Sequence, residues 1–417
     1  MDMTRGGPSK IVIDNRHLSD RLNDNKPTTK VKIMNLSTFQ YSELEGTPQA
    51  WALDTCSFAH KTLLVGKNAS GKSRTLSVIF GLAKILAGLA PPLKSGTYNS
   101  TFRDDEKEYS YHCMCKDNSV IAEVLRIDSK IFLERGTGGI GKIWAEKIDG
   151  GKHIDFQSPP SEFAVVARRD SIQHPFLEPL HLWASNVRHF QFGSNIGKDH
   201  LAHFSGTGLQ LDERDQAAVV ALFRNAVKTF GDAFIETLIQ DMATVDYNLE
   251  SVSIGPQVSL EIPSGFAQIV GLIVKEKELE GVTDQIGMSQ GMYRVLSLLI
   301  NVNYFQLKNS GSCILVDDIG EGLDFDRSCR LIGLLRRKAD QSKLQIIIST
   351  NDRFVMNEVP LDEWSMVQRK GSRVSFRNIH NSREIFENFK LTGLSNFSFL
   401  ELDVINEPIG EGANPDA

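Results

Sequence analysis

The sequence has no long hydrophobic run and few cysteines, and each absence excludes a class of protein. No apolar stretch in the 417 residues reaches the roughly 18 residues that a membrane-spanning helix needs, so we expect no membrane segment. The first residues lack the apolar core of a secretory signal, and we therefore expect a cytoplasmic protein. Five scattered cysteines do not make a disulfide framework, which agrees with a reduced compartment.

Motifs for metal binding and for nucleic-acid cleavage are also missing. Cys113 and Cys115 are spaced like half of a zinc site, but no second Cys/His pair stands at zinc spacing. We expect them to be two strand residues on the same face. The histidines form no His-Asn-His or His-Glu-x-x-His pattern, and no nuclease-type acidic set follows the apolar run at 313–316. We therefore expect no nuclease in this chain.

Charge is present without a strong excess of either sign. The formal net charge is −6, with 24% charged and 41% hydrophobic residues, which is ordinary for a globular protein. This balance argues against a protein that coats nucleic acid by bulk electrostatics. Two basic clusters, Arg168-Arg169 and Arg336-Arg337-Lys338, could contact nucleic acid locally, although a solvated face is the commoner role of such clusters.

Hydrophobic patterning divides the chain into several regions. We predict flexible tails over residues 1–29 and 407–417, which are poor in large apolar groups. Alternating stretches separated by glycine and asparagine turns predict an antiparallel β subdomain over about 100–160. A helical lobe is expected over about 161–288, including a helix at 265–279. No heptad run is long enough for an extended coiled coil.

The last third of the chain alternates helix and strand patterns. Helices are expected at 289–307 and 327–339, and short apolar strands at 313–316 and 345–349. Alternation of this kind predicts a parallel sheet, because parallel strands need a crossover between them.

The strongest motif runs from Gly66 to Ser73 and fits G-x-x-x-x-G-K-[ST] after a strand and at the start of a helix. Its glycines let successive backbone N–H groups point at phosphate oxygens, and the helix start adds a positive dipole. Lys72 would contact the β- and γ-phosphates of ATP, and Ser73 would bind Mg²⁺. The predicted nucleotide contacts in this segment are Gly66, Asn68, Ala69, Ser70, Gly71, Lys72, Ser73 and Arg74.

An acidic pair ends the buried strand at 313–316. In a parallel sheet this places Asp317 and Asp318 beside the phosphate loop. Asp317 is expected to orient Mg²⁺ and its waters, and Asp318 to polarise the attacking water. A strand that ends in Asp-Asp is also found at ordinary turns and helix caps, but the phosphate loop favours the catalytic interpretation.

These motifs resemble those of ABC-type ATPase heads of the structural-maintenance-of-chromosomes kind. More narrowly, the chain resembles compact bacterial ATPases of phage-defence operons, such as the Septu, retron-associated and overcoming-lysogenisation-defect systems, over about residues 30–406. The resemblance implies an α/β P-loop head with a parallel core sheet, an inserted antiparallel β subdomain and a helical lobe.

Three further motifs carry the resemblance. Ser289 and Gly291 match the family signature that contacts the γ-phosphate bound by the opposite subunit, with Gln290 in place of the usual glycine. Leu323-Asp324 fits the dimer-contacting loop. Asn351 stands where the family commonly has a switch histidine, and it cannot carry a proton at neutral pH.

Some assignments within the resemblance stay open. Asp318 replaces the family's usual glutamate, so either hydrolysis is slow or Glu321 contributes to catalysis, unless Glu321 is only a solvated loop charge. Gln173 and Gln191 are both candidates for a glutamine that senses Mg²⁺.

The resemblance also implies partners. We expect a homodimer, or a higher even-numbered oligomer, that hydrolyses ATP and gates a separate effector, a nuclease or a toxin, in anti-phage defence. Two alternatives stay open: a DNA-maintenance or repair clamp, and a nucleotide-dependent scaffold with little turnover, which Asp318 and Asn351 would favour. The clamp would normally need long coiled-coil arms between Lys72 and Ser289.

Overall fold

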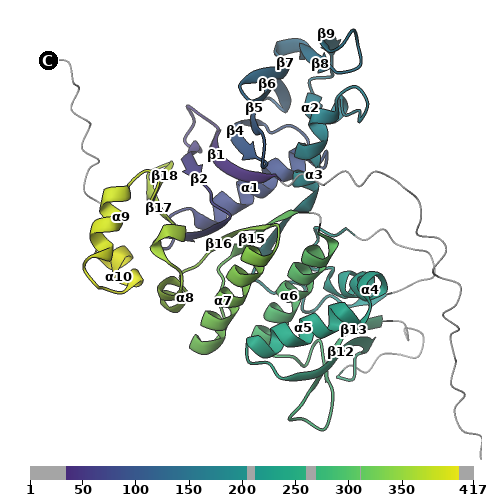
Figure 1. The fold of residues 1–417 in the computed structure, drawn as a ribbon, viewed down its shortest axis with the longest axis vertical. Coiled ribbons are helices and arrows are strands. Elements are labelled where there is room, and N and C mark those ends of the chain that lie inside the picture. Colours follow the sequence, from purple (N-terminus) through teal and green to yellow (C-terminus); the bar gives the residue numbers. More distant parts are fainter. Residues whose placement is uncertain (1–33, 204–211, 260–268, 310, 403–417) are drawn as a thin grey trace, which may run out of the picture. The chain divides into compact units, whose positions relative to one another are not determined.

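A 14-stranded sheet runs through the computed structural model, which describes residues 34–203, 212–259, 269–309 and 311–402 (Figure 1). The strands follow one another across the sheet in the order β10 (Val187–Gln191), β15 (Ser312–Asp317), β16 (Leu344–Ser349), β3 (Lys61–Val65), β17 (Trp364–Lys370), β18 (Arg373–Asn378), β2 (Trp51–Ser57), β1 (Asn35–Glu43), β4 (Ser95–Arg103), β5 (Glu108–Lys116), β6 (Ser119–Ile127), β7 (Lys130–Arg135), β8 (Ile140–Ala145) and β9 (Lys152–Gln157).

The first five strands in this order, β10 to β17, are parallel neighbours. Side chains bury both of their faces, and all six residues of β16 are buried. Leu64 and Ile347 point into one core with helices α1 (Lys72–Leu86) and α3 (Glu178–Asn186). Leu63 and Ile348 point into the other core with α6 (Gln290–Lys308) and α7 (Phe325–Gln341). Parallel strands covered by helices on both faces confirm the predicted α/β class.

The predicted β subdomain corresponds to β4–β9, which are all antiparallel neighbours. These strands continue the core sheet through β1, which pairs with both β2 and β4, and do not form a sheet of their own. Cys113 and Cys115 lie on β5 and are both buried, as expected for residues two apart on a strand.

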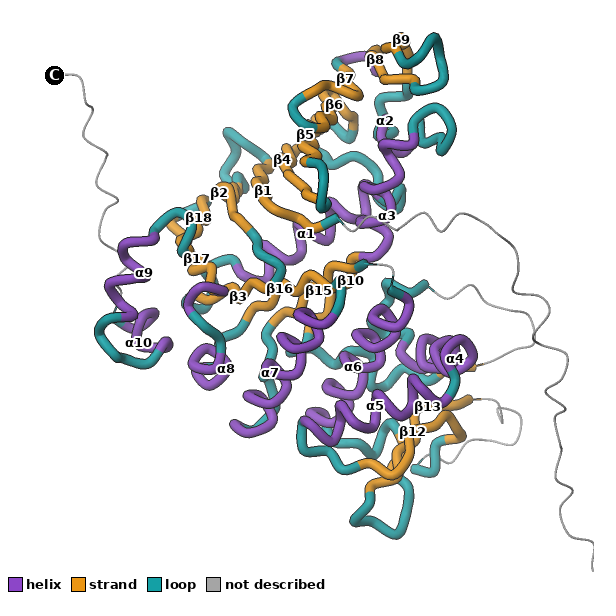
Figure 2. The backbone as a smooth tube through the Cα atoms, in the orientation of Figure 1, coloured by secondary structure: helices purple, strands orange, loops and turns teal. Residues whose placement is uncertain are grey.

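The expected helix at 265–279 is wrong. Residues 269–276 form strand β13 (Ile269–Glu276), which pairs with β12 (Leu249–Pro256), while 260–268 lie outside the described residues. The stretch Ile269-Val270-Gly271-Leu272-Ile273-Val274 is rich in β-branched residues, and Leu272 and Val274 alternate into the core. Figure 2 shows both strands beside helices α4 (Val219–Phe230) and α5 (Asp232–Thr244).

The helical lobe is therefore mixed. Short strands β11 (Ala202–His203) and β14 (Thr283–Asp284) complete its small sheet, and residues 187–191, which were expected to be helical, form β10 of the core sheet. The remaining helices are α2 (Ala164–Ala167), α8 (Arg353–Glu358), α9 (Arg383–Lys390) and α10 (Asn396–Glu401). The tails predicted at 1–29 and 407–417 lie outside the described residues. Within the described ranges, no helix is both long and apolar enough to cross a membrane.

Candidate functional site

The loop between β3 and α1 has a backbone that only small residues permit. A Cβ atom on Gly66 would lie 2.4 Å from the Val367 carbonyl oxygen, which no side chain tolerates. Gly71 has φ +108° and Ala69 has φ +61°, both in the left-handed region. Gly71 is the N-cap of α1. Because glycine has no side chain, no cap side chain occupies the N–H groups of the first helical turn. The loop is thus shaped to receive an anion.

Lys72 is buried at the loop–helix junction, where it is 5% exposed. Its Nζ donates to the carbonyl oxygens of Gly66 at 2.7 Å and Lys67 at 3.3 Å, so the side chain folds back over the loop. Burial lowers the pKa of the Lys72 ammonium, and the negative charges of Asp318 and Asp317 oppose that shift. Lys72 therefore lies within electrostatic reach of the acidic pair.

The loop fits a phosphate group. Ser70 Oγ is buried and has no hydrogen-bond partner among the described residues. Ser73 is exposed on the first turn of α1, where its hydroxyl is accessible to a ligand. Asn68 and Ala69 are exposed and line a cavity of about 390 Å³, whose other wall is formed by residues 366–371 at the end of β17 and the turn after it.

Arg74 makes its described contacts outside the loop. It forms an ion pair with Glu43 on β1, and its guanidinium lies 4.2 Å from the centre of the Trp51 ring on β2. These contacts do not bring the Arg74 side chain together with the other predicted nucleotide contacts.

The acidic pair stands at the carboxyl end of β15. Asp317 is 7% exposed and accepts a hydrogen bond from Ser349 Oγ at the end of β16. Asp318 leaves the strand with φ +55°, and its N–H donates to the same hydroxyl at 3.0 Å. Asn351 Nδ2 donates to Asp318 Oδ1 at 3.4 Å. Asn351 is thus brought to the acidic pair.

Electrostatics distinguish Asp318 from an ordinary surface carboxyl. Burial raises its pKa, the charges of Asp317 and Glu321 raise it further, and Lys72 opposes the rise. Glu321 lies one turn further on, with its N–H donating to the Asp318 carbonyl at 3.3 Å, and its side chain is exposed. Both carboxyl groups named as water-activating candidates therefore lie at this edge.

The fold separates the two candidate glutamines. Gln191 ends β10 directly opposite Asp317 in the parallel register, and the next N–H, of Phe192, donates to the Asp317 carbonyl at 2.9 Å. Gln173 lies in a different loop. Its carbonyl oxygen accepts a hydrogen bond at 3.0 Å from the N–H of Glu146, the residue that follows strand β8. Of the two candidates, Gln191 is therefore the one that lies beside Asp317.

Sequence reasoning missed His189, two residues before Gln191 on β10. It pairs with Leu315 in register, and its ring lies 5.6 Å from that of Phe80. Burial lowers the pKa of His189, while Asp317 opposes the shift. Identifying this strand from the sequence would have exposed the histidine as a neighbour of the acidic pair.

Ser289 and Gly291 form a separate part of the site. Ser289 is exposed and caps α6, and its Oγ accepts from the Met292 N–H at 3.1 Å. Gly291 is packed so closely that a Cβ there would lie 3.0 Å from the Gly322 carbonyl oxygen. None of the contacts described for these two residues reaches the phosphate loop. Within one chain, the signature and the phosphate loop are not brought together.

The two basic clusters make internal contacts. Arg169 pairs with Glu178 at 2.7 Å, and Arg168 lies over the Phe156 ring. Arg336 pairs with Glu363 through two 2.8 Å hydrogen bonds, and Lys338 is buried against Asp241. These contacts engage every member of the two clusters except Arg337, which is exposed and for which no such contact is described.

Comparison with known proteins establishes the fold. A crystal structure of an SmcHead bound to the C-winged helix domain of ScpA matches with a TM-score of 0.52 at 14% identity, covering 84% of this chain and 99% of that one. The chain has the fold of an SMC head. An Smc head domain with an extended coiled coil, bound to the C-terminal domain of ScpA from Pyrococcus furiosus, matches at 13% identity and TM-score 0.48, covering 86% and 100%. No protein-family model and no curated protein sequence matches the chain.

The SMC-head fold confirms the fold class expected from the sequence. The narrower resemblance to phage-defence ATPases and the roles of individual residues stay predictions.

Proposed function

We propose that this chain binds and hydrolyses ATP as an ATPase head. One observation carries the proposal: the phosphate loop, with its buried Lys72, shares the carboxyl edge of the sheet with Asp317 and Asp318. Ligands bind at this edge of parallel sheets because the strands deliver their loops and helix starts there. The buried Ser70 hydroxyl and the uncapped first turn of α1 are donors suited to phosphate oxygens.

The residues also fit Mg²⁺. Asp317 and the Ser73 hydroxyl would hold it, and when bound it would neutralise charge on the β- and γ-phosphates. Within the described ranges, no group of three or more His, Cys, Asp or Glu residues forms a metal cage. Mg²⁺ in ATPases keeps waters and phosphate oxygens as ligands, so it needs no such cage.

The chain's own groups would then perform hydrolysis. Lys72 places a positive charge against the phosphates, which stabilises charge in the transition state. Asp318 or Glu321 orients the attacking water and accepts its proton as the bond from the γ-phosphorus to the bridging oxygen breaks. Asn351 holds Asp318 by a hydrogen bond and is itself able to donate to a γ-phosphate oxygen.

The active unit that we propose is a dimer, or a higher even-numbered oligomer. Ser289 and Gly291 have no described contact with their own phosphate loop, yet Ser289 is exposed at a helix start. Two copies placed head-to-tail would bring each Ser289 to the nucleotide held by its partner. Each composite site would then need one phosphate loop and one signature from different chains.

The biological role that we propose rests on the sequence resemblance: closure of two heads gates a separate effector, a nuclease or a toxin, in anti-phage defence. The main alternative is a DNA clamp for maintenance or repair. The segment between Lys72 and Ser289 holds strands and short helices, and within the described residues no pair of long arms emerges from it. The internal contacts of the basic clusters also weaken the case for nucleic acid.

Phosphate release by the purified chain, with and without DNA, tests these roles. Basal turnover that DNA leaves unchanged supports the gating ATPase. Turnover that DNA stimulates supports the clamp. ATP binding without turnover supports a scaffold, and absence of ATP binding would refute the nucleotide site itself.

A further inference from the structure

Arg294 lies on the second turn of α6, five residues after Ser289, and is 8% exposed. Its guanidinium donates to three main-chain carbonyl oxygens: Nε to Ser194 at 3.1 Å, one terminal nitrogen to Gly193 at 2.9 Å, and the other to Glu321 at 2.7 Å. A buried guanidinium whose described hydrogen bonds all go to backbone carbonyls fixes the backbone, and the charge of the nearby Glu321 carboxylate also favours its charged form.

The three acceptors belong to two loops of the site. Gly193 and Ser194 follow Gln191 at the end of β10, and Glu321 follows Asp318 at the end of β15. The loops touch each other, since a Cβ on Gly193 would lie 3.4 Å from Glu321 Cγ and 3.6 Å from Asp318 Cβ. Gly322 also packs on the guanidinium, where a Cβ would lie 2.6 Å from a terminal nitrogen of Arg294. Arg294 thus holds the start of α6 against both loops.

We infer that Arg294 is a positioning residue that couples the two halves of the ATPase. It fixes Ser289, which faces a second copy, relative to Gln191 and Asp318, which act on the chain's own nucleotide. The inference rests on the proposed function. The planar fork of arginine reaches three carbonyls at once, whereas a lysine ammonium is a single point charge that cannot span them. Arg294→Lys therefore keeps the positive charge but cannot form all three hydrogen bonds to the carbonyl oxygens at once.

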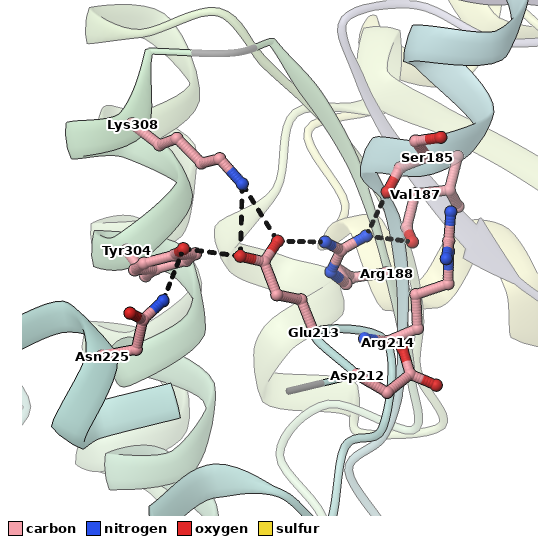
Figure 3. Close-up of polar contacts among 9 residues, drawn as sticks. All are labelled: Ser185, Val187, Arg188, Asp212, Glu213, Arg214, Asn225, Tyr304 and Lys308. Carbon is pink, nitrogen blue, oxygen red and sulfur yellow. Dashed lines mark hydrogen bonds and ion pairs between the residues drawn. The ribbon is translucent and has the colours of Figure 1, made fainter. Parts of the chain in front are cut away.

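Arg188 is a matched control, and Figure 3 shows its contacts. It is 2% exposed, lies on β10, and donates to the carbonyl oxygens of Ser185 at 2.8 Å and Val187 at 2.9 Å. Its other terminal nitrogen donates to Glu213 at 3.1 Å, and Glu213 also accepts from Tyr304 at 2.6 Å. Arg188 thus joins β10 to the far end of α6 and has no described hydrogen bond with the loops at 193–194 or 321.

The experiment compares Arg294→Lys with Arg188→Lys in the full-length chain. For each we measure the melting temperature, the ATP dissociation constant by calorimetry, and kcat and KM for phosphate release. Both variants should lower the melting temperature to a similar extent. Only Arg294→Lys should lower kcat, by roughly 10- to 100-fold, because small misplacements of catalytic groups cost that much. ATP affinity should stay within about twofold, since the phosphate loop is untouched.

Wild-type kcat in Arg294→Lys would overturn the inference, as would an equal loss of kcat in Arg188→Lys. If Arg294→Lys fails to fold, Gly322→Ala offers a second route, because its Cβ displaces the same guanidinium; a wild-type kcat there would also overturn the inference. Absence of turnover in the wild-type chain would instead refute the proposed function, and the inference with it.

Discussion

Helices α1 and α6 begin at the two separate parts of the candidate site, and their first turns are built differently. Gly71 precedes α1 in a left-handed conformation with φ +108° and offers no side-chain cap. Ser289 precedes α6 in an extended conformation, and its Oγ already accepts from the Met292 N–H at 3.1 Å. The start of α1 lies under the folded-back Lys72 side chain, whereas the start of α6 carries an exposed serine.

The difference indicates which half of the site works alone. At α1 no side chain of the cap occupies the first-turn N–H groups, so an anion can accept from them without breaking a cap hydrogen bond. At α6 the Ser289 hydroxyl already accepts a hydrogen bond from the Met292 N–H of its own helix. To contact a phosphate as well, the hydroxyl must share or give up that hydrogen bond. We therefore expect one chain to bind nucleotide and two chains to be required for hydrolysis. The following experiments test that division, from the largest expected effect to the smallest.

Lys72→Ala should weaken ATP binding and remove hydrolysis. The variant loses a charged donor to phosphate, which costs about 1.5–3 kcal/mol, or roughly 10- to 100-fold in ATP affinity by calorimetry. Lys84→Ala, at the far end of the same helix, is the control and should bind ATP like the wild type. Normal ATP affinity in Lys72→Ala would mean that the phosphate loop is misassigned.

Ser289→Arg should separate nucleotide binding, which needs one chain, from hydrolysis, which needs two. Nucleotide binding by one chain stays nearly unchanged because the phosphate loop and Asp317 are untouched. Hydrolysis should be abolished, because bulk and charge stand where two heads must close. Calorimetry and phosphate release on the same sample measure both quantities. Ser289→Ala adds no bulk but loses both the cap and the hydroxyl proposed to reach the partner's nucleotide, and it should cost about 1 kcal/mol of stability.

A mixture of Ser289→Arg with Lys72→Ala sharpens this test. A mixed dimer pairs both lesions in one composite site and leaves the other intact, so turnover should partly recover although neither variant is active alone. Full activity of Ser289→Arg by itself would contradict the two-chain arrangement and leave only a generic phosphate-loop ATPase.

Asp318→Asn should slow hydrolysis while Asp317 still supports Mg-ATP binding. Loss of a general base typically lowers the rate by about 10²- to 10⁴-fold. Glu321→Gln is the matched comparison, because the two residues lie on one turn at this edge. The backbone N–H of Glu321 donates to the carbonyl oxygen of Asp318. Phosphate release under saturating ATP measures both variants. If Glu321→Gln abolishes turnover and Asp318→Asn does not, Glu321 activates the water.

Glu213→Gln should have the smallest effect and act on stability alone. Burial raises the pKa of Glu213, but hydrogen bonds from Tyr304 and Lys308 and the charges of Lys308 and Arg188 outweigh it, so the pKa is lowered (Figure 3). A carboxylate with a lowered folded-state pKa stabilises the protein above its unfolded pKa of about 4.3 and loses this as pH falls through the folded value.

The variant should lose about 1–3 kcal/mol at pH 7 and show a shallower decline of stability on acidification, measured by urea unfolding from pH 7 to 3. Glu278→Gln, at an exposed position, is the control. ATP affinity should not change in either variant. A Glu213→Gln variant with wild-type stability and acid sensitivity would contradict the role of this network.

Local patterns predicted the elements that carry the site. The strands ending at Val65, Asp317 and Ser349 are short apolar runs, and each is followed by a recognisable polar motif. Because they are buried on both faces, their composition is nearly uniform and easily identified. The helix after Ser289 was predicted from its periodicity and found at 290–308.

Other elements depend on partners far away in the chain. The run at 269–276 is apolar enough for a helix or a strand, and only pairing with β12 makes it a strand. Strand β10 is only five residues long. It is held in the sheet by pairing with β15, which lies more than a hundred residues later in the chain. Gln191 and Gln173 are equivalent in the sequence, and the register with Asp317 alone separates them.

The sequence by itself predicted the phosphate loop, because Gly66, Gly71, Lys72 and Ser73 form a local motif whose backbone shape neighbouring residues specify. Tertiary structure decided what surrounds that chemistry. Arg294 is one arginine among many until folding brings the carbonyls of Gly193, Ser194 and Glu321 around it. Hydrogen bonds to backbone atoms leave no residue pattern, since every residue has a carbonyl group. The positioning of the site is therefore readable only in the folded chain.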